Sequence, residues 1–300
     1  MRITFVVPFV NLTGGIRMVL GSANALHDRG HEVRVVYPTW PYRFHFSRRE
    51  QMAEFRKALG SPARVPWFEL RAELRRVPIV RTAFLPEADV VVATSWPTAH
   101  DVARLDPSRG RRVHLVMHHE AGTGPETRIR AVYGLPLRRV TISRRVQTEL
   151  EQAFRCEVAA VVPCGVDPHV FHPEGVRDER AVLMLLHPDP RKGAADGLAA
   201  LTAVRERVPD LRVTLCATVR PERWPCWATL VFHPSDDVLR RLYATSAVFL
   251  YPSRYEGFGL PPWSRWPAGA RSSPRGSGPW RSSPGTAATP WSSLQEMWPA

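Results

Sequence analysis

The chain has 300 residues, 44% of them hydrophobic, and a formal net charge of +13. This length suits two α/β domains, and the composition is that of a globular protein rather than a disordered or fibrous one. No stretch reaches the ~18–20 apolar residues of a membrane span, so the sequence does not predict a transmembrane helix.

Only two of the 41 basic residues are lysines, Lys57 and Lys192. Such an arginine bias indicates GC-rich coding DNA, which explains part of the positive charge without any function. The positive charge that this bias does not explain favours anionic partners such as nucleotide phosphates, acidic lipids or nucleic acid. Because no nucleic-acid-binding motif is recognisable, we do not expect a nucleic-acid partner.

Strands and helices alternate in the first half of the chain, which predicts a doubly wound parallel sheet. Met1–Val10 has the pattern of a first strand rather than of a signal peptide. The predicted strands are Ile3–Phe9, Glu32–Tyr37, Asp89–Ala93, Val113–His118, Val140–Ser143 and Val158–Pro163. The predicted helices are Gly14–Arg29 and residues 98–105, 126–133 and 144–154.

A polar, proline-containing segment, Gly165–Pro173, predicts a domain boundary after residue 172. A second Rossmann-like series follows and is incomplete at Pro262. Its predicted strands are Ala181–Leu186, Leu211–Ala217, Leu230–Phe232 and Ala247–Tyr251, and its predicted helices are residues 194–207 and Asp236–Thr245. We therefore expect domains at 1–172 and 173–262, and an aberrant tail at 263–300.

Five arginines alternate with apolar residues between Arg64 and Leu85. Two interpretations are open: a basic amphipathic surface for an anionic membrane, or an ordinary solvated helix. The four cysteines form no Cys-x-x-Cys pair and have no metal-ligand spacing, so we expect free thiols. Asp189-Pro190 is not a metal-binding acidic pair, and no metal site is predicted.

Two glycine-containing turns stand where strands meet helices. Gly14-Gly15 opens the first helix, and Arg191-Lys192-Gly193 opens the first helix of the second series. Free N–H groups at a helix N-terminus attract phosphate, and a neighbouring cation strengthens that attraction. Both turns are therefore candidate phosphate sites, although solvated helix starts would look the same.

Two further motifs follow predicted strands. Glu256-Gly257-Phe258-Gly259 comes after the last strand, where backbone N–H groups and one carboxylate could hold the hydroxyls of a sugar. His118-His119-Glu120 ends a strand at the edge where open α/β sheets bind ligands. Read alone, these motifs are also compatible with an acidic turn and with packed or solvated histidines.

The composition changes after Pro262. Residues 263–300 contain five of the ten tryptophans, six prolines and eight serines, but no Val, Ile, Phe or Tyr. Such a segment offers no strand or buried helix, and we expect it to be disordered. The alternatives are a genuine Pro/Ser-rich linker and a frameshift. With permitted codons, reading one base earlier turns Trp263-Ser264 into Leu-Glu and continues with strand-forming residues.

Together these motifs resemble the retaining nucleotide-sugar glycosyltransferases of the two-Rossmann-domain (GT-B) type, in particular the family-4-like group with a Glu-x7-Glu motif. The resemblance covers about residues 1–262. It rests on Gly14-Gly15, Val162–Asp167 with Phe171-His172-Pro173, Arg191-Lys192-Gly193 and, most specifically, Tyr251–Pro262. The second glutamate of the motif falls at position 264, where this chain has Ser264, and the restored frame would supply it.

The resemblance implies a nucleoside diphosphate sugar donor and no cofactor or metal. Lys192, with Arg191, would neutralise the diphosphate, and Glu256 with the N–H groups of Gly257, Phe258 and Gly259 would hold the sugar. Gly14 and Gly15 would cover the donor from the other domain, and His118 would lie near the reacting centre. His118 and Glu256 are thus the catalytic candidates, and transfer would retain the anomeric configuration.

The first hypothesis is therefore a hexosyl- or deoxyhexosyltransferase that acts on a glycan or lipid-linked acceptor. We expect it to be cytoplasmic, with peripheral contact to an anionic inner membrane face, to serve cell-envelope glycan synthesis, and to be impaired in this truncated chain. The alternative is a non-catalytic nucleotide- or glycan-binding relative.

Overall fold

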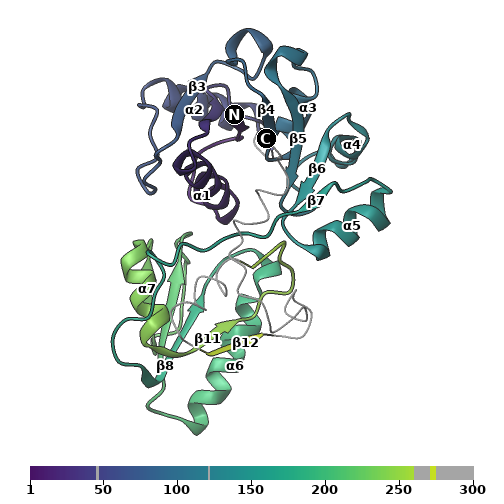
Figure 1. The fold of residues 1–300 in the computed structure, drawn as a ribbon. Helices are drawn as coiled ribbons and strands as arrows, with labels where there is room; N and C mark the ends of the chain where they lie inside the picture. Colours follow the sequence, from purple (N-terminus) through teal and green to yellow (C-terminus); the bar gives the residue numbers. More distant parts are fainter. Residues whose placement is uncertain (45–46, 121, 260–270, 275–300) are drawn as a thin grey trace. The chain divides into compact units, whose positions relative to one another are not determined.

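The structure, a computed structural model, describes residues 1–44, 47–120, 122–259 and 271–274. The chain divides into two compact units between Gly165 and Val166. Each unit is a parallel β-sheet with helices packed against it (Figure 1). The predicted α/β class with two Rossmann-like domains is confirmed.

Unit 1 contains a seven-stranded sheet in the order β3-β2-β1-β4-β5-β6-β7. Its strands are β1 (Arg2–Val6), β2 (Glu32–Pro38), β3 (Glu73–Val77), β4 (Val90–Ala93), β5 (Arg111–Val116), β6 (Arg138–Thr141) and β7 (Ala160–Val161). Its α-helices are α1 (Gly14–Asp28), α2 (Arg48–Leu59), α3 (Trp96–Val102), α4 (Glu126–Ala131) and α5 (Arg144–Phe154). Short 3-10 turns η1 (Thr82–Phe84), η2 (Pro107–Arg109) and η3 (Val132–Gly134) complete it.

Unit 2 contains a five-stranded sheet in the order β10-β9-β8-β11-β12. Its strands are β8 (Asp178–Leu185), β9 (Arg212–Ala217), β10 (Ala228–Phe232), β11 (Ser246–Tyr251) and β12 (Arg271–Pro274). The 3-10 turn η4 (Pro190–Lys192) and the helices α6 (Ala194–Arg207) and α7 (Asp236–Thr245) connect them.

The sheet of unit 2 is apolar on both faces, as a doubly wound sheet must be. Along β8, Val182 and Met184 pack with Leu201 of α6, whereas Leu183 packs on the other face with Tyr243 of α7. Successive side chains of a strand point to opposite faces, so one strand supplies both cores.

The division of the chain lies seven residues before the boundary expected from the sequence. Phe171 is buried in the core of unit 2, with Val166 and Val170 packed beside it. Three apolar side chains therefore anchor the segment Gly165–Pro173 in unit 2. The prediction had treated this segment as a linker because most of its other residues are polar or proline.

The prediction of a helix between Arg64 and Leu85 is wrong. This stretch holds β3, which pairs with β2 at the edge of the sheet, and the turn η1. Two of its arginines face protein: Arg71 pairs with Asp28, and Arg76 donates to the backbone carbonyls of Ala58 and Ser61. Helix α2, which precedes it, was not predicted; it has no buried residue and therefore no apolar stripe.

The proposed frameshift point at Pro262 and Ser264 lies outside the described residues. Within the tail, the structure describes one short strand, β12, which pairs in parallel with β11. The prediction that the tail offers no strand is thus wrong at Arg271–Pro274. Backbone N–H and C=O groups at the open edge of β11 can be satisfied by any strand, whatever its side chains.

The thiols of Cys156, Cys164, Cys216 and Cys226 form no disulfide, as expected. None of the helices in the described part of the chain combines the length and the apolar character needed to cross a membrane.

Candidate functional site

The strand order of unit 2 defines where a ligand can bind. The chain runs from β8 outward to β9 and β10, then crosses over to place β11 on the other side of β8. In open α/β sheets, ligands bind beyond the carboxyl ends of the strands at this switch of direction. Residues 186–193 follow β8 and residues 252–259 follow β11, so both loops lie at the switch point.

Gly193 allows these two loops to pack together. Its φ of 65° lies in the left-handed region, and a Cβ atom there would come within 2.2 Å of the carbonyl oxygen of Pro252. A backbone hydrogen bond from Arg254 to the carbonyl of Arg191, 2.7 Å long, joins the loops at a second point. The turn that carries Lys192 is therefore fixed against the segment that carries Glu256.

Lys192 and Glu256 meet at the centre of these loops. The Lys192 Nζ atom lies 2.7 Å from Glu256 Oε1, and the Tyr251 hydroxyl donates to the same oxygen. The side chains of Lys192 and Glu256 are 35% and 17% exposed, so both can reach a ligand. Burial and the Glu256 carboxylate raise the pKa of Tyr251, which keeps its hydroxyl a donor.

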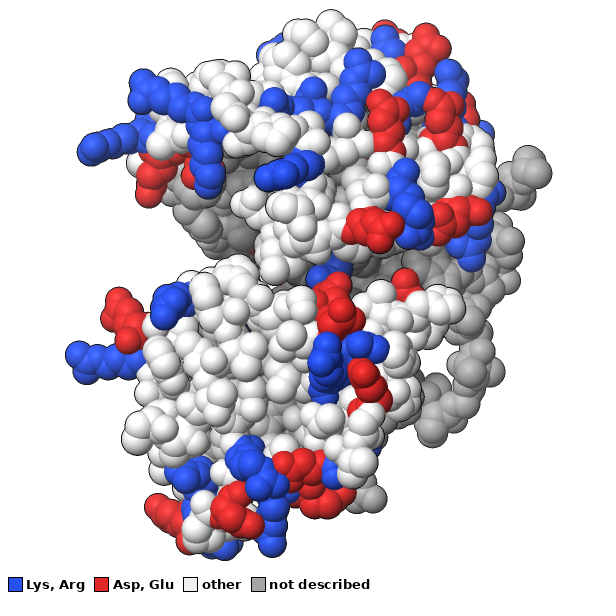
Figure 2. Space-filling model, turned by 90° about the vertical axis from the view of Figure 1, so that its left-hand side faces the viewer, with Lys and Arg blue, Asp and Glu red and all other residues white. Residues whose placement is uncertain are grey.

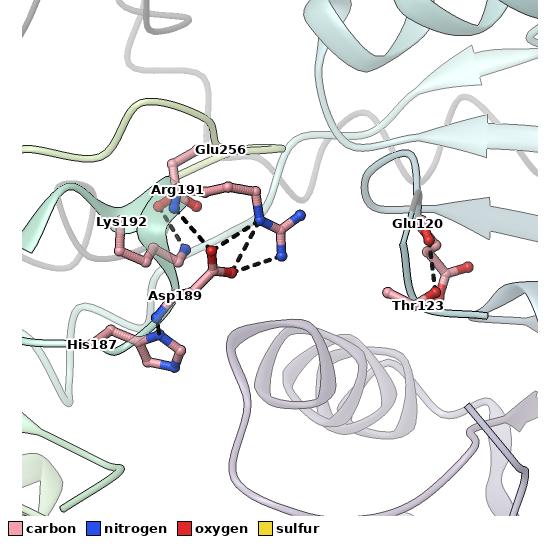
Figure 3. Close-up of polar contacts among 7 residues, drawn as sticks. All are labelled: Glu120, Thr123, His187, Asp189, Arg191, Lys192 and Glu256. Carbon is pink, nitrogen blue, oxygen red and sulfur yellow. Dashed lines mark hydrogen bonds and ion pairs between the residues drawn. The ribbon is translucent and has the colours of Figure 1, made fainter. Parts of the chain in front are cut away.

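Asp189 and Arg191 form a second pair on the same turn (Figure 3). Asp189 Oδ1 accepts the backbone N–H of Arg191 at 2.9 Å, and the carboxylate also accepts the guanidinium, with Nη2 2.7 Å from Oδ2. These hydrogen bonds lower the pKa of Asp189 to about 2. The carboxylate is thus fully ionised at neutral pH and holds a guanidinium that is half exposed.

A third pair joins Arg254 to Asp196 of α6, with 2.9 Å between Nη2 and Oδ2. We call these six residues, Asp189, Arg191, Lys192, Asp196, Arg254 and Glu256, the switch-point cluster. Its three cations are balanced by three carboxylates. His187 lies beside it, and its Nδ1 accepts the N–H of Asp189 at 3.1 Å (Figure 3). Burial, and then Lys192, lower the pKa of His187, so it adds no charge at neutral pH.

The segment after Glu256, Gly257-Phe258-Gly259, carries no charged side chain. Phe258 is 8% exposed and anchors the segment, and Gly259 has a φ of 84°, which favours glycine. The predicted residues Arg191, Lys192, Glu256, Gly257, Phe258 and Gly259 therefore all lie on the two loops that meet at the switch point of unit 2.

The switch point of unit 1 lies between β1 and β4. The first helix begins there: Thr13 is the N-cap of α1 and accepts the N–H of Ile16, and Gly14 and Gly15 form the first turn. A Cβ atom at Gly15 would lie 3.2 Å from the side chain of Met117, the residue before His118. The predicted residues Gly14, Gly15 and His118 are thus brought to one edge of this sheet.

The two neighbouring histidines after β5 differ in environment. The His119 ring packs against the stacked pair of Tyr133 and Phe154 and contacts the Tyr133 hydroxyl at 3.1 Å, so it is a packed histidine. His118 precedes it and, like His119, is partly exposed; it stays the catalytic candidate that the family resemblance implies.

Sequence reasoning passed over several residues at these edges. Glu120, partly buried, accepts the N–H of Trp96 at the start of α3, and desolvation raises its pKa to about 8. The Thr123 hydroxyl donates to the Glu120 carbonyl at 2.7 Å (Figure 3). Asp189, considered only as a metal ligand, and Tyr251 are the residues missed in unit 2. In the described ranges no three potential metal-ligating side chains gather.

Two parallel α/β units, each with loops that meet at a switch point, are compatible with the GT-B architecture. Comparison with known proteins gives the family. The model of Glycosyltransferase Family 4 matches residues 13–170, more than half of the chain. The chain therefore belongs to Glycosyltransferase Family 4, and its predicted class is confirmed.

A curated relative is the phosphatidyl-myo-inositol mannosyltransferase of Mycolicibacterium smegmatis, 27% identical over 233 residues. The match covers 72% of this chain and 58% of the relative, so the chain spans little more than half the length of that protein.

Two solved structures have a similar fold. TarM superposes with a TM-score of 0.67 at 8% identity, covering 90% of this chain and 84% of that chain. Sucrose-phosphate synthase from Thermosynechococcus elongatus has a TM-score of 0.63 at 15% identity, covering 90% of this chain and 80% of that chain. At such identities the likeness concerns the fold alone.

Proposed function

We propose that unit 2 binds a nucleoside diphosphate sugar and that the protein transfers the sugar, with retention of configuration, to a glycan or lipid-linked acceptor. The observation that carries this proposal is the Lys192–Glu256 pair at the switch point. An ammonium group there can bind phosphate oxygens, and the carboxylate can accept hydrogen bonds from sugar hydroxyls.

The leaving nucleoside diphosphate develops negative charge as the bond to the sugar breaks. Lys192 and Arg191 are preorganised on the turn before α6, whose N-terminus adds a favourable dipole. In this proposal, these cations supply the stabilisation. In unit 1, Gly14 and Gly15 begin α1, and the family resemblance gives His118 as a catalytic candidate beside Glu256.

The acceptor proposal rests on the relative from Mycolicibacterium smegmatis, whose name describes transfer of mannose to a phosphatidyl-inositol lipid. A lipid-linked acceptor for cell-envelope glycan synthesis would bring a cytoplasmic protein to an anionic membrane face. Basic side chains on the face shown in Figure 2 mostly stand next to acidic ones, rather than in one continuous basic patch.

Lys192→Met tests the donor site, and the chain offers a matched control. Lys57, the only other lysine, is exposed on α2, so Lys57→Met removes the same charge elsewhere. We expect Lys192→Met to weaken binding of the tightest of UDP, GDP and ADP at least tenfold, since a charge-assisted bond contributes about 1.5–3 kcal/mol. Isothermal titration calorimetry measures the nucleotide affinity of each variant, and circular dichroism checks that the variant is folded.

Equal affinities of the Lys192→Met and Lys57→Met variants would contradict the proposed donor site. Lys192→Arg keeps the charge and should retain part of the affinity, which separates a lost contact from a disturbed loop. Nucleotide binding without transfer from any nucleotide sugar would favour the alternative, a non-catalytic nucleotide- or glycan-binding relative.

We further propose that the coding DNA carries a frameshift near the codons of Pro261–Ser264. Glycosyltransferase membership supports this, because the second glutamate of the Glu-x7-Glu pattern would fall at position 264. Resequencing this region should reveal one missing base, with Glu at position 264 in the restored frame. An intact frame with no continuation in either other frame would contradict it.

A further inference from the structure

The switch-point cluster is electrically balanced, although the donor proposed for it is polyanionic. Each cation already has a carboxylate within 3 Å: Arg191 with Asp189, Lys192 with Glu256, and Arg254 with Asp196. A diphosphate that binds there must take at least one cation from its partner. The inference below rests on the proposed donor site and concerns which pair opens.

The Asp189–Arg191 pair is built differently from the other two. Its partners are two residues apart on one turn, and Asp189 also accepts the backbone N–H of Arg191 as the N-cap of η4. The carboxylate is therefore held by the backbone, and its side chain is 22% exposed. The guanidinium at the end of a long side chain is 51% exposed, so it is the partner that can swing away.

The Lys192–Glu256 pair is less free to open. Glu256 is held on two sides, because the Tyr251 hydroxyl donates to the oxygen that also accepts Lys192. Arg254 is 62% exposed, but it comes from the other loop, and its partner Asp196 lies in the first turn of α6 rather than on the Asp189–Gly193 turn. Arg191 is thus the cation that combines a loose side chain with a place on the same turn as Lys192.

We propose that Asp189 is an intramolecular competitor of the donor diphosphate and sets its affinity. In the free protein Asp189 holds the Arg191 guanidinium; in the donor complex the diphosphate takes over that guanidinium, and Asp189 keeps only the backbone N–H. When the nucleoside diphosphate product leaves, Asp189 recaptures Arg191 and so promotes release. The Asp189–Arg191 ion pair thus lowers the affinity for the nucleoside diphosphate product, so that the product does not bind too tightly.

Asp189→Asn is the variant that tests this. An asparagine side chain can still accept the N–H of Arg191 and cap the turn, but it cannot hold the guanidinium as an ion pair. Affinity for the tightest of UDP, GDP and ADP should rise about three- to tenfold, the range expected for releasing one partly exposed ion pair and removing one like charge. The gain should shrink as salt increases.

Two comparison variants identify the cause. Asp196→Asn also removes one carboxylate from the cluster but releases Arg254 rather than Arg191, so it should raise affinity clearly less than Asp189→Asn does. In an Arg191→Gln background, Asp189→Asn should give less than half of its gain, because the guanidinium it would release is gone. All variants are measured by calorimetry on the full chain in the same buffer.

The results separate the two proposals. If Lys192→Met weakens nucleotide binding but Asp189→Asn leaves it unchanged, the role of Asp189 is refuted and the donor site stands. A gain that persists in the Arg191→Gln background, or that Asp196→Asn reproduces, also refutes it, because net charge alone would then explain the effect. If the wild-type chain and all variants bind none of the three nucleotides, both proposals fail.

Discussion

The two sheet edges that carry the candidate residues differ in the kind of side chain that they present. In unit 2, ions whose side chains range from 17% exposed in Glu256 to 62% exposed in Arg254 stand in three matched pairs around a glycine turn. In unit 1, the edge is aromatic: Phe44 packs edge-on against both Phe9 and Trp96, with ring centroids 5.8 and 6.2 Å apart. The Arg128 guanidinium covers Trp96 at 5.4 Å from the ring centroid.

Titratable groups follow the same contrast. The pKa of Asp189 in unit 2 falls to about 2, because a cation stabilises its charge. In unit 1 burial favours the neutral forms, raising the pKa of Glu120 to about 8 and lowering that of His114 to about 3. The switch point of unit 2 thus carries ionised groups in pairs, whereas these two buried groups of unit 1 are held in their neutral forms.

The largest expected effect is a loss of stability of unit 2 when Gly193 is replaced. Gly193→Ala places a Cβ atom 2.2 Å from the Pro252 carbonyl oxygen at a positive φ, so we expect about 3 kcal/mol or more of lost stability. Gly21→Ala in α1 is the matched control: no atom lies within 4 Å of its added Cβ, and alanine favours helix by about 1 kcal/mol.

Thermal unfolding of both glycine variants measures this difference. Gly193→Ala should lower the transition of unit 2 and weaken nucleotide binding together, while Gly21→Ala raises or preserves the transition of unit 1. A Gly193→Ala variant as stable as the wild type would show that the two loops are not clamped at this glycine.

The second prediction concerns the neutral groups of unit 1. Glu120 has a folded pKa near 8, above its ordinary 4.5, so its contribution to stability falls as pH rises between these values. His114, with a folded pKa near 3 against 6.5, contributes a rise in stability from pH 3 to 6.5. The two slopes oppose each other up to pH 6.5, and above it Glu120 acts alone.

Between pH 6.5 and 8, Glu120 should therefore cost unit 1 up to about 2 kcal/mol, at 1.36 kcal/mol per pH unit. Urea unfolding at several pH values measures the loss, and Glu120→Gln should abolish it. Glu126→Gln, which neutralises a nearby exposed carboxylate, is the control and should keep the slope. An unchanged slope in Glu120→Gln would mean that Glu120 is ionised in the folded protein.

Local signals predicted most of the secondary structure. The bounds of α5, α6 and α7 agree with the helices predicted at 144–154, 194–207 and Asp236–Thr245, and the side chains of Ser143 and Ser235 cap two of them. Residues 48–85 could not be predicted in this way. Helix α2 buries no side chain, and the edge strand β3 alternates charged residues with few apolar ones.

The candidate site was predicted only in part, for a related reason. Lys192 and Glu256 are 64 residues apart, and it was the family resemblance, not local pattern, that linked them. The capture of Arg191 by Asp189 needed the conformation of one turn, which the short Asp-Pro-Arg-Lys sequence does not determine. Glu120 was overlooked because its environment depends on α3, which is distant in sequence.

The smallest expected effect is the loss of unfolding free energy when one carboxylate of the cluster is removed. Its size tests whether the ion pairs of unit 2 serve binding rather than stability. The Arg254–Asp196 pair has side chains 62% and 29% exposed, and solvent-exposed pairs contribute about 0–1 kcal/mol. Asp196→Asn should therefore lower the urea unfolding free energy by less than 1 kcal/mol, and Asp189→Asn by a similarly small amount. A loss above about 2 kcal/mol in either variant would show that the cluster holds unit 2 together. In that case the pairs would be structural, and the contrast between an ion-exchanging unit 2 and an apolar unit 1 would have to be abandoned.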